Sequence, residues 1–129
     1  MRKLDTNWLY LISKILINKI EMSDEVKKWF NLAENDFKSA KKNFKMKIYY
    51  VSAFLCQQSV EKGLKALYIK KYNKLWKIHD LIELAKKVDA NSEIIDVCAK
   101  LNSTSIETRY PDVPVSYAKK RDHRIIKQC

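Results

Sequence analysis

The chain has 129 residues, enough for one domain. Its 26 Lys and Arg residues exceed its 15 Asp and Glu residues for a formal net charge of +11, while 47% hydrophobic residues provide for a core and argue against wholesale disorder. A single Gly and two Pro argue against a many-stranded β fold, a Gly-rich phosphate loop and a dinucleotide-binding fingerprint, all of which need turn residues or glycines. The composition predicts an all-α fold.

Residues 1–21 form an amphipathic N-terminal extension. The apolar positions of the stretch 8–20 fall on one helical face. The stretch is too short and too charged to span a bilayer, and it lacks the small-residue cleavage site of a signal peptide. We expect no membrane span, and docking on the domain or on a second copy is favoured over a membrane surface. Alternatively, Met22 is the natural start.

The first helix of the domain is expected from Ser23 to about Lys45. Ser23 is a suitable N-cap, and the two acidic residues after it suit the positive end of the helix dipole. Apolar residues then recur at alternating steps of four and three, which is typical of an amphipathic helix. These positions are Val26, Phe30, Ala33, Phe37, Ala40 and Phe44.

A second helix is expected to start near Ile48 and to be central, because its apolar stripe is wide. The stripe consists of Ala53, Cys56, Val60, Leu64 and Leu67, and is widened by Val51 and Leu55. Gly63 inside this helix indicates a close helix crossing. The segment Lys70–His79 is expected to be a basic loop.

Two further helices and a short last one complete the predicted bundle. Asp80 is the expected N-cap of the third helix, and Asn91 or Ser92 begins the fourth. Pro111 ends the fourth, and Pro114 opens a last helix, short and basic, that runs through Tyr117 to Ile126. We therefore predict an up-and-down helical bundle of about four to five helices over residues 22–129, with an extra N-terminal helix.

The three cysteines are odd in number and widely spaced. Without a CxxC pair, a zinc ribbon and a thioredoxin-like motif are excluded, and free thiols fit a cytoplasmic location. Cys56 and Cys98 are expected to be small core residues on helices. His79 and His123 have no acidic or thiol cluster beside them, so no metal site is expected.

Four segments, in order and spacing, resemble the HEPN family between about Met22 and Asp112. They are Ala33-Glu34-Asn35-Asp36-Phe37 followed by Ser39-Ala40, the stretch Phe54–Leu67 with its Gln57-Gln58-Ser59-Val60-Glu61-Lys62-Gly63 centre, His79-Asp80-Leu81 followed by Glu83-Leu84, and Glu107-Thr108-Arg109-Tyr110-Pro111-Asp112. The resemblance implies an all-α bundle that is usually a homodimer. It also implies a nucleotidyltransferase partner, a nucleotide ligand, or ribonuclease activity in toxin–antitoxin systems.

The ribonuclease members of that family carry an Arg and a His with four to six residues between them. At those spacings after Arg109 this chain has Pro114, Val115 and Ser116, and His123 comes too late. The resemblance therefore implies a non-catalytic module without a cofactor. The alternative is a divergent ribonuclease that uses Arg109 with Tyr110 or His79 in place of the missing histidine.

Several residues are candidate ligand contacts. His79 precedes a helix N-terminus, where anions bind, unless Asp80 caps the helix and His79 only bonds locally. Arg109, Tyr110 and Asp112 resemble a small ligand site on a loop, or an Arg–Asp pair that holds the turn.

Other polar side chains lie near the helix stripes: Asn35, Asp36, Gln57, Gln58, Glu61 and Lys65. An inter-helix hydrogen-bond network is the favoured interpretation. Under the family resemblance some of them, with Lys65 among the candidates, line a ligand cleft.

The basic charge is concentrated in two places. Lys62 through Lys77 contains six Lys and no acid, and five bases stand against one acid from Pro114 onward. Such a surface favours RNA, a nucleotide or an acidic protein, although a Lys-rich surface needs no ligand. A passive nucleic-acid-binding bundle is a third hypothesis that rests on charge alone.

Overall fold

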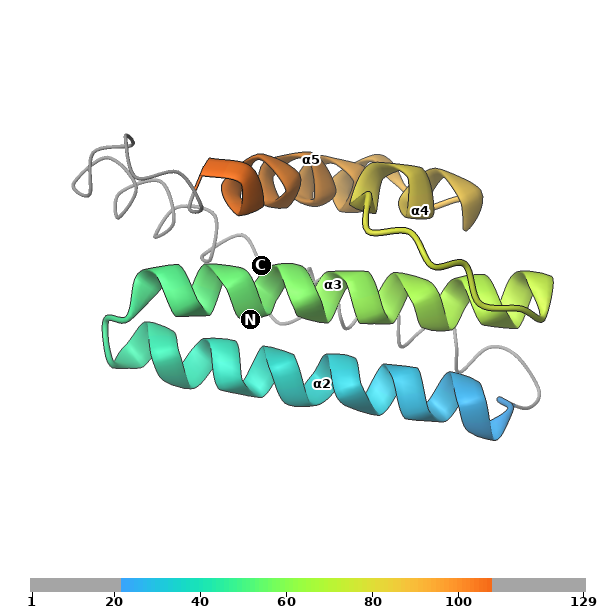
Figure 1. Ribbon diagram of the computed structural model, residues 1–129, viewed down its shortest axis with the longest axis horizontal. Coiled ribbons are helices and arrows are strands. Elements are labelled where there is room, and N and C mark those ends of the chain that lie inside the picture. The colour runs from blue at the N-terminus through green and yellow to red at the C-terminus, as the bar shows by residue number, and fades with distance from the viewer. Residues whose placement is uncertain (1–21, 108–129) are drawn as a thin grey trace.

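The structure, a computed structural model, describes residues 22–107 and the side chains of 22–102. This part of the chain contains four helices and no strand: α2 (Asp24–Lys45), α3 (Tyr49–Tyr72), α4 (Leu81–Lys87) and α5 (Ser92–Glu107). α3 lies between α2 on one side and α4 with α5 on the other (Figure 1). The predicted all-α bundle is confirmed, while the expected helices within 1–21 and after Pro114 lie outside the described residues.

α2 begins where its cap was expected. The side-chain oxygen of Ser23 accepts a hydrogen bond from the backbone N–H of Val26 at 3.2 Å, and the helix ends at Lys45. The predicted apolar stripe is its inner face, because Val26, Ala33, Phe37 and Ala40 are all buried. No helix in residues 22–107 is long and apolar enough to cross a membrane.

α3 is the central helix of the bundle, as its wide stripe predicts. It contacts α2, α4 and α5. The five stripe positions are fully or almost fully buried: Ala53, Cys56, Val60, Leu64 and Leu67. Because α3 has neighbours on opposite sides, side chains on most of its circumference are buried.

Two buried hydrogen bonds hold α2 and α3 in antiparallel register. The hydroxyl of Ser59 donates to the carbonyl of Ala33 at 2.6 Å, and that of Ser52 donates to the carbonyl of Ala40 at 2.7 Å. The two serines and the two alanines are each seven residues apart, so small residues meet at two levels of the pair. Gly63 is also buried, one turn beyond Ser59 in the same row, which suits the close approach that it predicts.

The end of α3 corrects the expected loop at Lys70. The helix continues to Tyr72 and stops at Asn73, which adopts the left-handed conformation with φ 58°. The ring of Tyr68 lies 4.5 Å from that of Tyr72 and 5.4 Å from that of Trp76, centroid to centroid. This aromatic packing stabilises the last turn of α3, in a segment whose basic residues had led us to expect a loop.

The predicted starts of the last two helices are confirmed. Asp80 Oδ1 accepts from the backbone N–H groups of Ile82 at 3.0 Å and of Glu83 at 3.3 Å, which caps α4. Asn91 Oδ1 accepts from the N–H of Ile94 at 3.0 Å at the start of α5. Both caps satisfy backbone donors that the helix itself leaves unpaired.

Cys56 and Cys98 are buried free cysteines, as the sequence predicts. Burial, with a smaller contribution from the negative charge of Asp80, raises the pKa of the Cys98 thiol to about 12. Cys129 lies outside the described residues.

Candidate functional site

The buried polar side chains of the described residues all belong to α3. They are Ser52, Gln57, Ser59, Glu61 and Lys65. The serines bond to α2, whereas Gln57, Glu61 and Lys65 follow one another at steps of four along a single row of the helix. That row, together with the loop that passes it, is the candidate site.

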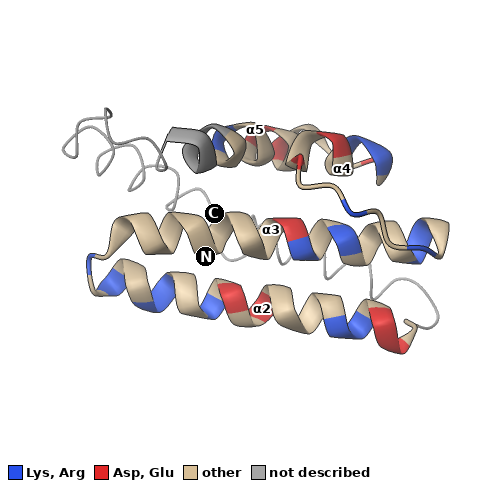
Figure 2. Cartoon of the chain, viewed as in Figure 1, with Lys and Arg blue, Asp and Glu red and all other residues tan. Residues whose placement is uncertain are grey.

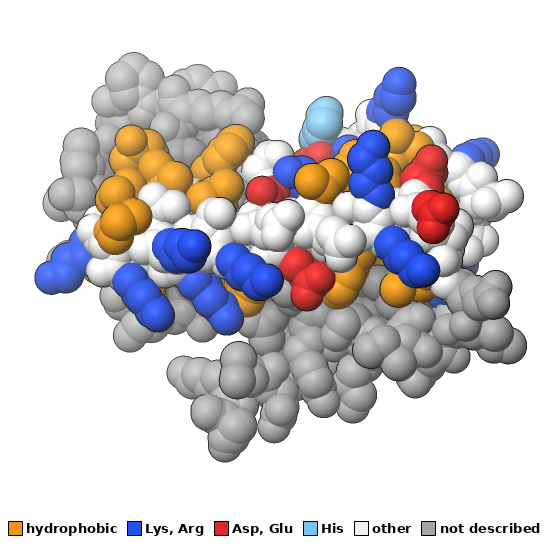
Figure 3. Space-filling view, turned by 90° about the horizontal axis from the view of Figure 1, so that it is seen from below, with side chains coloured by type: hydrophobic (Ala, Val, Ile, Leu, Met, Phe, Trp, Pro, Cys, Tyr) orange, Lys and Arg blue, Asp and Glu red, His pale blue; other side chains and the backbone are white. Residues whose placement is uncertain are grey.

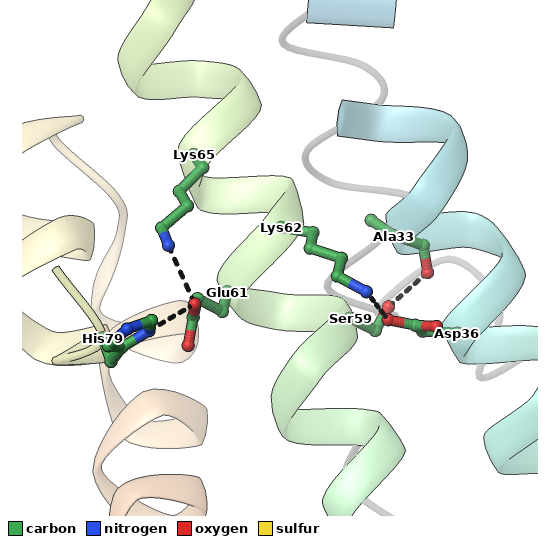
Figure 4. A network of polar contacts seen from close by, with 7 residues as sticks. All are labelled: Ala33, Asp36, Ser59, Glu61, Lys62, Lys65 and His79. Atoms are coloured by element: carbon green, nitrogen blue, oxygen red, sulfur yellow. Dashed lines mark hydrogen bonds and ion pairs between the residues drawn. The ribbon is translucent and has the colours of Figure 1, made fainter. Parts of the chain in front are cut away.

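Glu61 is the centre of this site (Figure 4). Its Oε2 atom accepts a hydrogen bond from Lys65 Nζ at 2.9 Å and lies 2.9 Å from His79 Nδ1. The side chains of Glu61 and Lys65 are 9% and 6% exposed, while that of His79 is 80% exposed. Two of the residues predicted as ligand contacts, Lys65 and His79, are therefore brought together by one buried carboxylate.

The hydrogen bond to Glu61 determines which ring nitrogen of His79 stays available for another partner. A carboxylate only accepts hydrogen bonds, so Nδ1 carries the proton that it donates to Glu61. In the neutral ring, Nε2 is then an acceptor. An exposed imidazole oriented in this way is able to accept a hydrogen bond from a ligand or to take up a proton from one.

Lys65 is held differently. Its ammonium group is buried against Glu61 and lies 5.6 Å from the centroid of the Trp29 ring on α2. A cation over an aromatic face is attracted by the ring quadrupole. The charge of Lys65 is thus used inside the bundle, and its contact with a ligand stays a prediction.

A second ion pair joins α2 to α3 beside this cluster. Lys62 Nζ lies 2.6 Å from Asp36 Oδ2, and both side chains are partly buried (Figure 4). This pair belongs to the inter-helix network that the sequence predicts. Gln57 departs from that expectation, because its Oε1 atom is buried without a hydrogen-bond partner.

Asp80 ties α4 to α5 as well as capping α4. Its Oδ1 atom accepts from Asn102 Nδ2 at 3.2 Å, and Asn102 Oδ1 accepts from the N–H of Leu81 at 3.4 Å. Asp80 therefore acts as the cap that the sequence predicts, and His79 bonds to Glu61 rather than at the helix end. The contact of His79 with a ligand stays a prediction.

The basic run at the end of α3 is partly used within the fold. Lys71 Nζ pairs with the carboxylate of Asp89 and donates to the carbonyl of Lys87 at 3.1 Å. The hydrogen bond to Asp89 raises the pKa of Lys71. The hydroxyl of Tyr72 donates to the same Lys87 carbonyl at 3.0 Å. The last turns of α3 and α4 both carry lysines, whose positive charge interacts favourably with the negative C-terminal end of each helix dipole (Figure 2).

Comparison with known proteins decides the family. The family model of the HEPN domain matches residues 26–129, well over half of the chain. This chain belongs to the HEPN family. The resemblance carried by the four sequence segments is confirmed. No curated protein and no solved structure matches the chain.

Part of the predicted site in this HEPN chain lies beyond the described residues. Arg109, Tyr110 and Asp112, like His123, are in the segment that follows Glu107, and their roles stay predictions. Residues 22–107 contain no group of three or more His, Cys, Asp or Glu residues able to hold a metal ion.

Sequence reasoning missed three features of the HEPN bundle. These are the serine bonds between α2 and α3, the Trp29 ring beside Lys65, and the pairing of Glu61 with His79. Only the first had a signal: small residues seven apart on both helices, Ala33 with Ala40 and Ser52 with Ser59. The other two join residues far apart in the sequence, and no local pattern reports them.

Proposed function

We propose that this chain is a non-catalytic HEPN module that forms a homodimer and binds a nucleotidyltransferase partner, with a nucleotide as a further ligand. The observation that carries the proposal is the missing histidine after Arg109. The three positions where the ribonuclease motif needs it hold Pro114, Val115 and Ser116. None of these side chains has a group that titrates near neutral pH, so the histidine's role in general acid–base chemistry has no counterpart at that spacing.

The charge of the chain supports an anionic ligand. A formal net charge of +11 attracts a nucleotide or an acidic protein surface. We propose Arg109, Tyr110, Asp112, His79 and Lys65 as the ligand-binding residues. Within this set, the exposed ring of His79, oriented by Glu61, is able to hydrogen-bond a base or a phosphate.

Light scattering on the full chain, alone and mixed with a nucleotidyltransferase encoded in the same genome, tests the assembly. We expect a dimer alone and a larger, stoichiometric complex in the mixture. A chain that stays monomeric in both samples contradicts the proposal.

Titration with ATP tests the nucleotide site. We expect Arg109→Ala to weaken binding about tenfold, the effect of losing one charge-assisted contact of roughly 1.4 kcal/mol. Arg124→Ala is the matched control, since it removes the same charge from the basic C-terminal segment. An equal loss of ATP affinity in the two variants would show that only the net charge of the chain matters, and would contradict a specific role for Arg109.

A divergent ribonuclease is the second candidate, and one observation favours it. A histidine bonded through one ring nitrogen to a buried carboxylate, with an exposed ring, is the arrangement that orients a general base, and His79 has it. Arg109 would then stabilise charge on the phosphate, with Tyr110 or His79 acting for the missing histidine.

RNA cleavage without metal separates the two functions. The wild type is compared with Arg109→Ala and His79→Ala, and His123→Ala serves as the matched control. We expect intact RNA in every sample. Cleavage that disappears in Arg109→Ala and His79→Ala but persists in His123→Ala would make the protein a ribonuclease.

A further inference from the structure

The turn between α2 and α3 carries exposed apolar side chains. Met46, Ile48, Tyr50 and Phe54 are 62%, 37%, 67% and 48% exposed. We call these four residues the hairpin-tip surface. They are four of the seven large hydrophobic side chains exposed among the described residues, and they lie within one stretch of nine residues. Apolar side chains gather at this end of the molecule in Figure 3. A contiguous apolar patch of this kind marks an interaction site.

Lysines flank the hairpin-tip surface. Lys41, Lys42, Lys45 and Lys47 are exposed at the end of α2 and in the turn, and no Asp or Glu lies between Asp36 and Glu61 in the sequence. Figure 3 shows lysine side chains next to the apolar ones. The surface is therefore apolar in the middle and positive at its edge, so a partner that complements it carries negative charge.

Gln57 adds a second, independent observation. It follows Tyr50 and Phe54 at helical steps of four and three, so it shares their row of α3, about 4.5 Å beyond Phe54 along the axis. Its side chain is 8% exposed, and its Oε1 atom has no hydrogen-bond partner. A buried acceptor without a partner costs free energy until a donor reaches it.

We infer that the hairpin-tip surface binds an acidic, apolar segment of a protein partner. Such a segment supplies apolar side chains for Tyr50 and Phe54 and carboxylates for the flanking lysines. It also supplies an N–H donor for Gln57 Oε1, which is closed off in the free chain and becomes reachable when the Gln57 side chain turns outward. The inference rests on the proposed binding of a protein partner and names the surface that receives it.

A second copy of the chain does not suit this surface. A twofold contact applies the same patch of both subunits to each other. The lysines flanking one hairpin-tip surface would then face the lysines of the other, and like charges across an interface oppose association. The proposed homodimer therefore uses another face of the bundle.

Two other anionic occupants satisfy fewer of the observations. RNA would stack on Tyr50 and Phe54, but the aliphatic side chains of Met46 and Ile48 offer it no stacking face. An anionic membrane would accept the apolar and basic side chains, yet its phosphate and ester oxygens only accept hydrogen bonds, so that only a headgroup ammonium or hydroxyl could pair with Gln57 Oε1. Both are outcomes of the test below.

The test is selection of a displayed library of random peptides on the full, immobilised chain. We expect the selected peptides to be enriched in Asp and Glu together with aromatic or aliphatic residues. Their affinity should fall about tenfold in the double variant Tyr50→Ser/Phe54→Ser. It should fall several-fold in Lys45→Glu/Lys47→Glu and decline as salt is added.

Matched variants elsewhere on α2 are the controls. Leu32→Ser removes an exposed apolar side chain, and Lys27→Glu/Lys28→Glu reverses two exposed charges at the opposite end of the helix. Both should bind the selected peptides like the wild type. Because every substituted side chain is exposed, circular dichroism should show the same helix content in all variants.

The inference is overturned if no peptide is enriched, or if selected peptides bind all variants equally. It is also overturned if single-stranded RNA or phosphatidylserine vesicles, rather than peptides, lose affinity in Tyr50→Ser/Phe54→Ser. Measuring the nucleotidyltransferase complex in that variant separates this failure from failure of the proposed function. If the nucleotidyltransferase complex is undiminished in that variant, only the assignment of the hairpin-tip surface is wrong. If peptides bind but no complex forms with the wild type, only the nucleotidyltransferase partner is wrong.

Discussion

The Nδ1 atom of His79 lies 2.9 Å from the Oε2 atom of Glu61, 18 residues earlier in the chain. The same oxygen accepts from Lys65, so one buried carboxylate holds both a neighbour on its own helix and the loop that leads to α4. The carboxylate therefore connects the stability of α3 to the position of His79, a candidate ligand residue with an exposed ring.

Replacing Glu61 should be strongly destabilising. In Glu61→Ala the ammonium of Lys65 stays buried without its partner, and breaking a buried pair from one side costs about 3–5 kcal/mol. Urea denaturation measures the free energy of unfolding. Adding Lys65→Met to Glu61→Ala should restore most of it, because no uncompensated charge is left. A double variant as unstable as Glu61→Ala would contradict this account.

His79→Ala should change stability much less than Glu61→Ala. The imidazole is 80% exposed, and exposed ion pairs are worth at most about 1 kcal/mol. Hydrogen exchange should nevertheless become faster in the loop between α3 and α4, since the contact that holds it is lost. Unchanged exchange there would mean that Trp76 and Ile78, which pack on the core, hold the loop without His79.

Ser59→Ala should lower the free energy of unfolding by about 1 kcal/mol, the net worth of one buried hydrogen bond. Ser59→Val should cost more, because the branched side chain has no room where α2 and α3 approach closely. The control is Ser39→Ala on the exposed side of α2, which we expect to be neutral. If Ser59→Val is as stable as the wild type, the helices are not in close contact at this level.

Asp80→Ala should loosen α4. One carboxylate oxygen accepts from two backbone N–H groups of this seven-residue helix and from Asn102. Loss of an N-cap costs about 1–2 kcal/mol, and hydrogen exchange of the α4 amides should accelerate. Asp80→Asn keeps an accepting oxygen and should be intermediate. Glu83→Gln, in the first turn of the same helix, is the control for loss of negative charge.

Cys98 should make stability fall at high pH. Its pKa is 9.0 ordinarily and about 12 in the folded protein, so the folded state keeps its proton where the unfolded state loses it. The free energy of unfolding should therefore be unaffected below pH 9 and decrease as the pH rises from about 9 towards 12. Denaturation of wild type and Cys98→Ala over this range measures the effect. Parallel curves would show that Cys98 is not its source.

The sequence alone predicts most local features of this protein correctly. Helical periodicity identified the buried faces of α2 and α3, and Ser23, Asp80 and Asn91 were recognisable as caps from the residue types around them. It placed the end of α3 three residues too early, because the last turn depends on the packing of Tyr68 against Trp76 beyond the helix. Ring packing across a turn leaves no periodic signal.

Caps and apolar stripes depend on interactions within about four residues of the chain, so residue type and spacing determine them. The pairing of His79 with Glu61 and that of Ser59 with Ala33 span 18 and 26 residues. Such pairs form only when the helices pack, because the packing determines which side chains of neighbouring segments lie opposite one another. Sequence therefore determined the helices and the family, and the tertiary structure decided which polar residues meet.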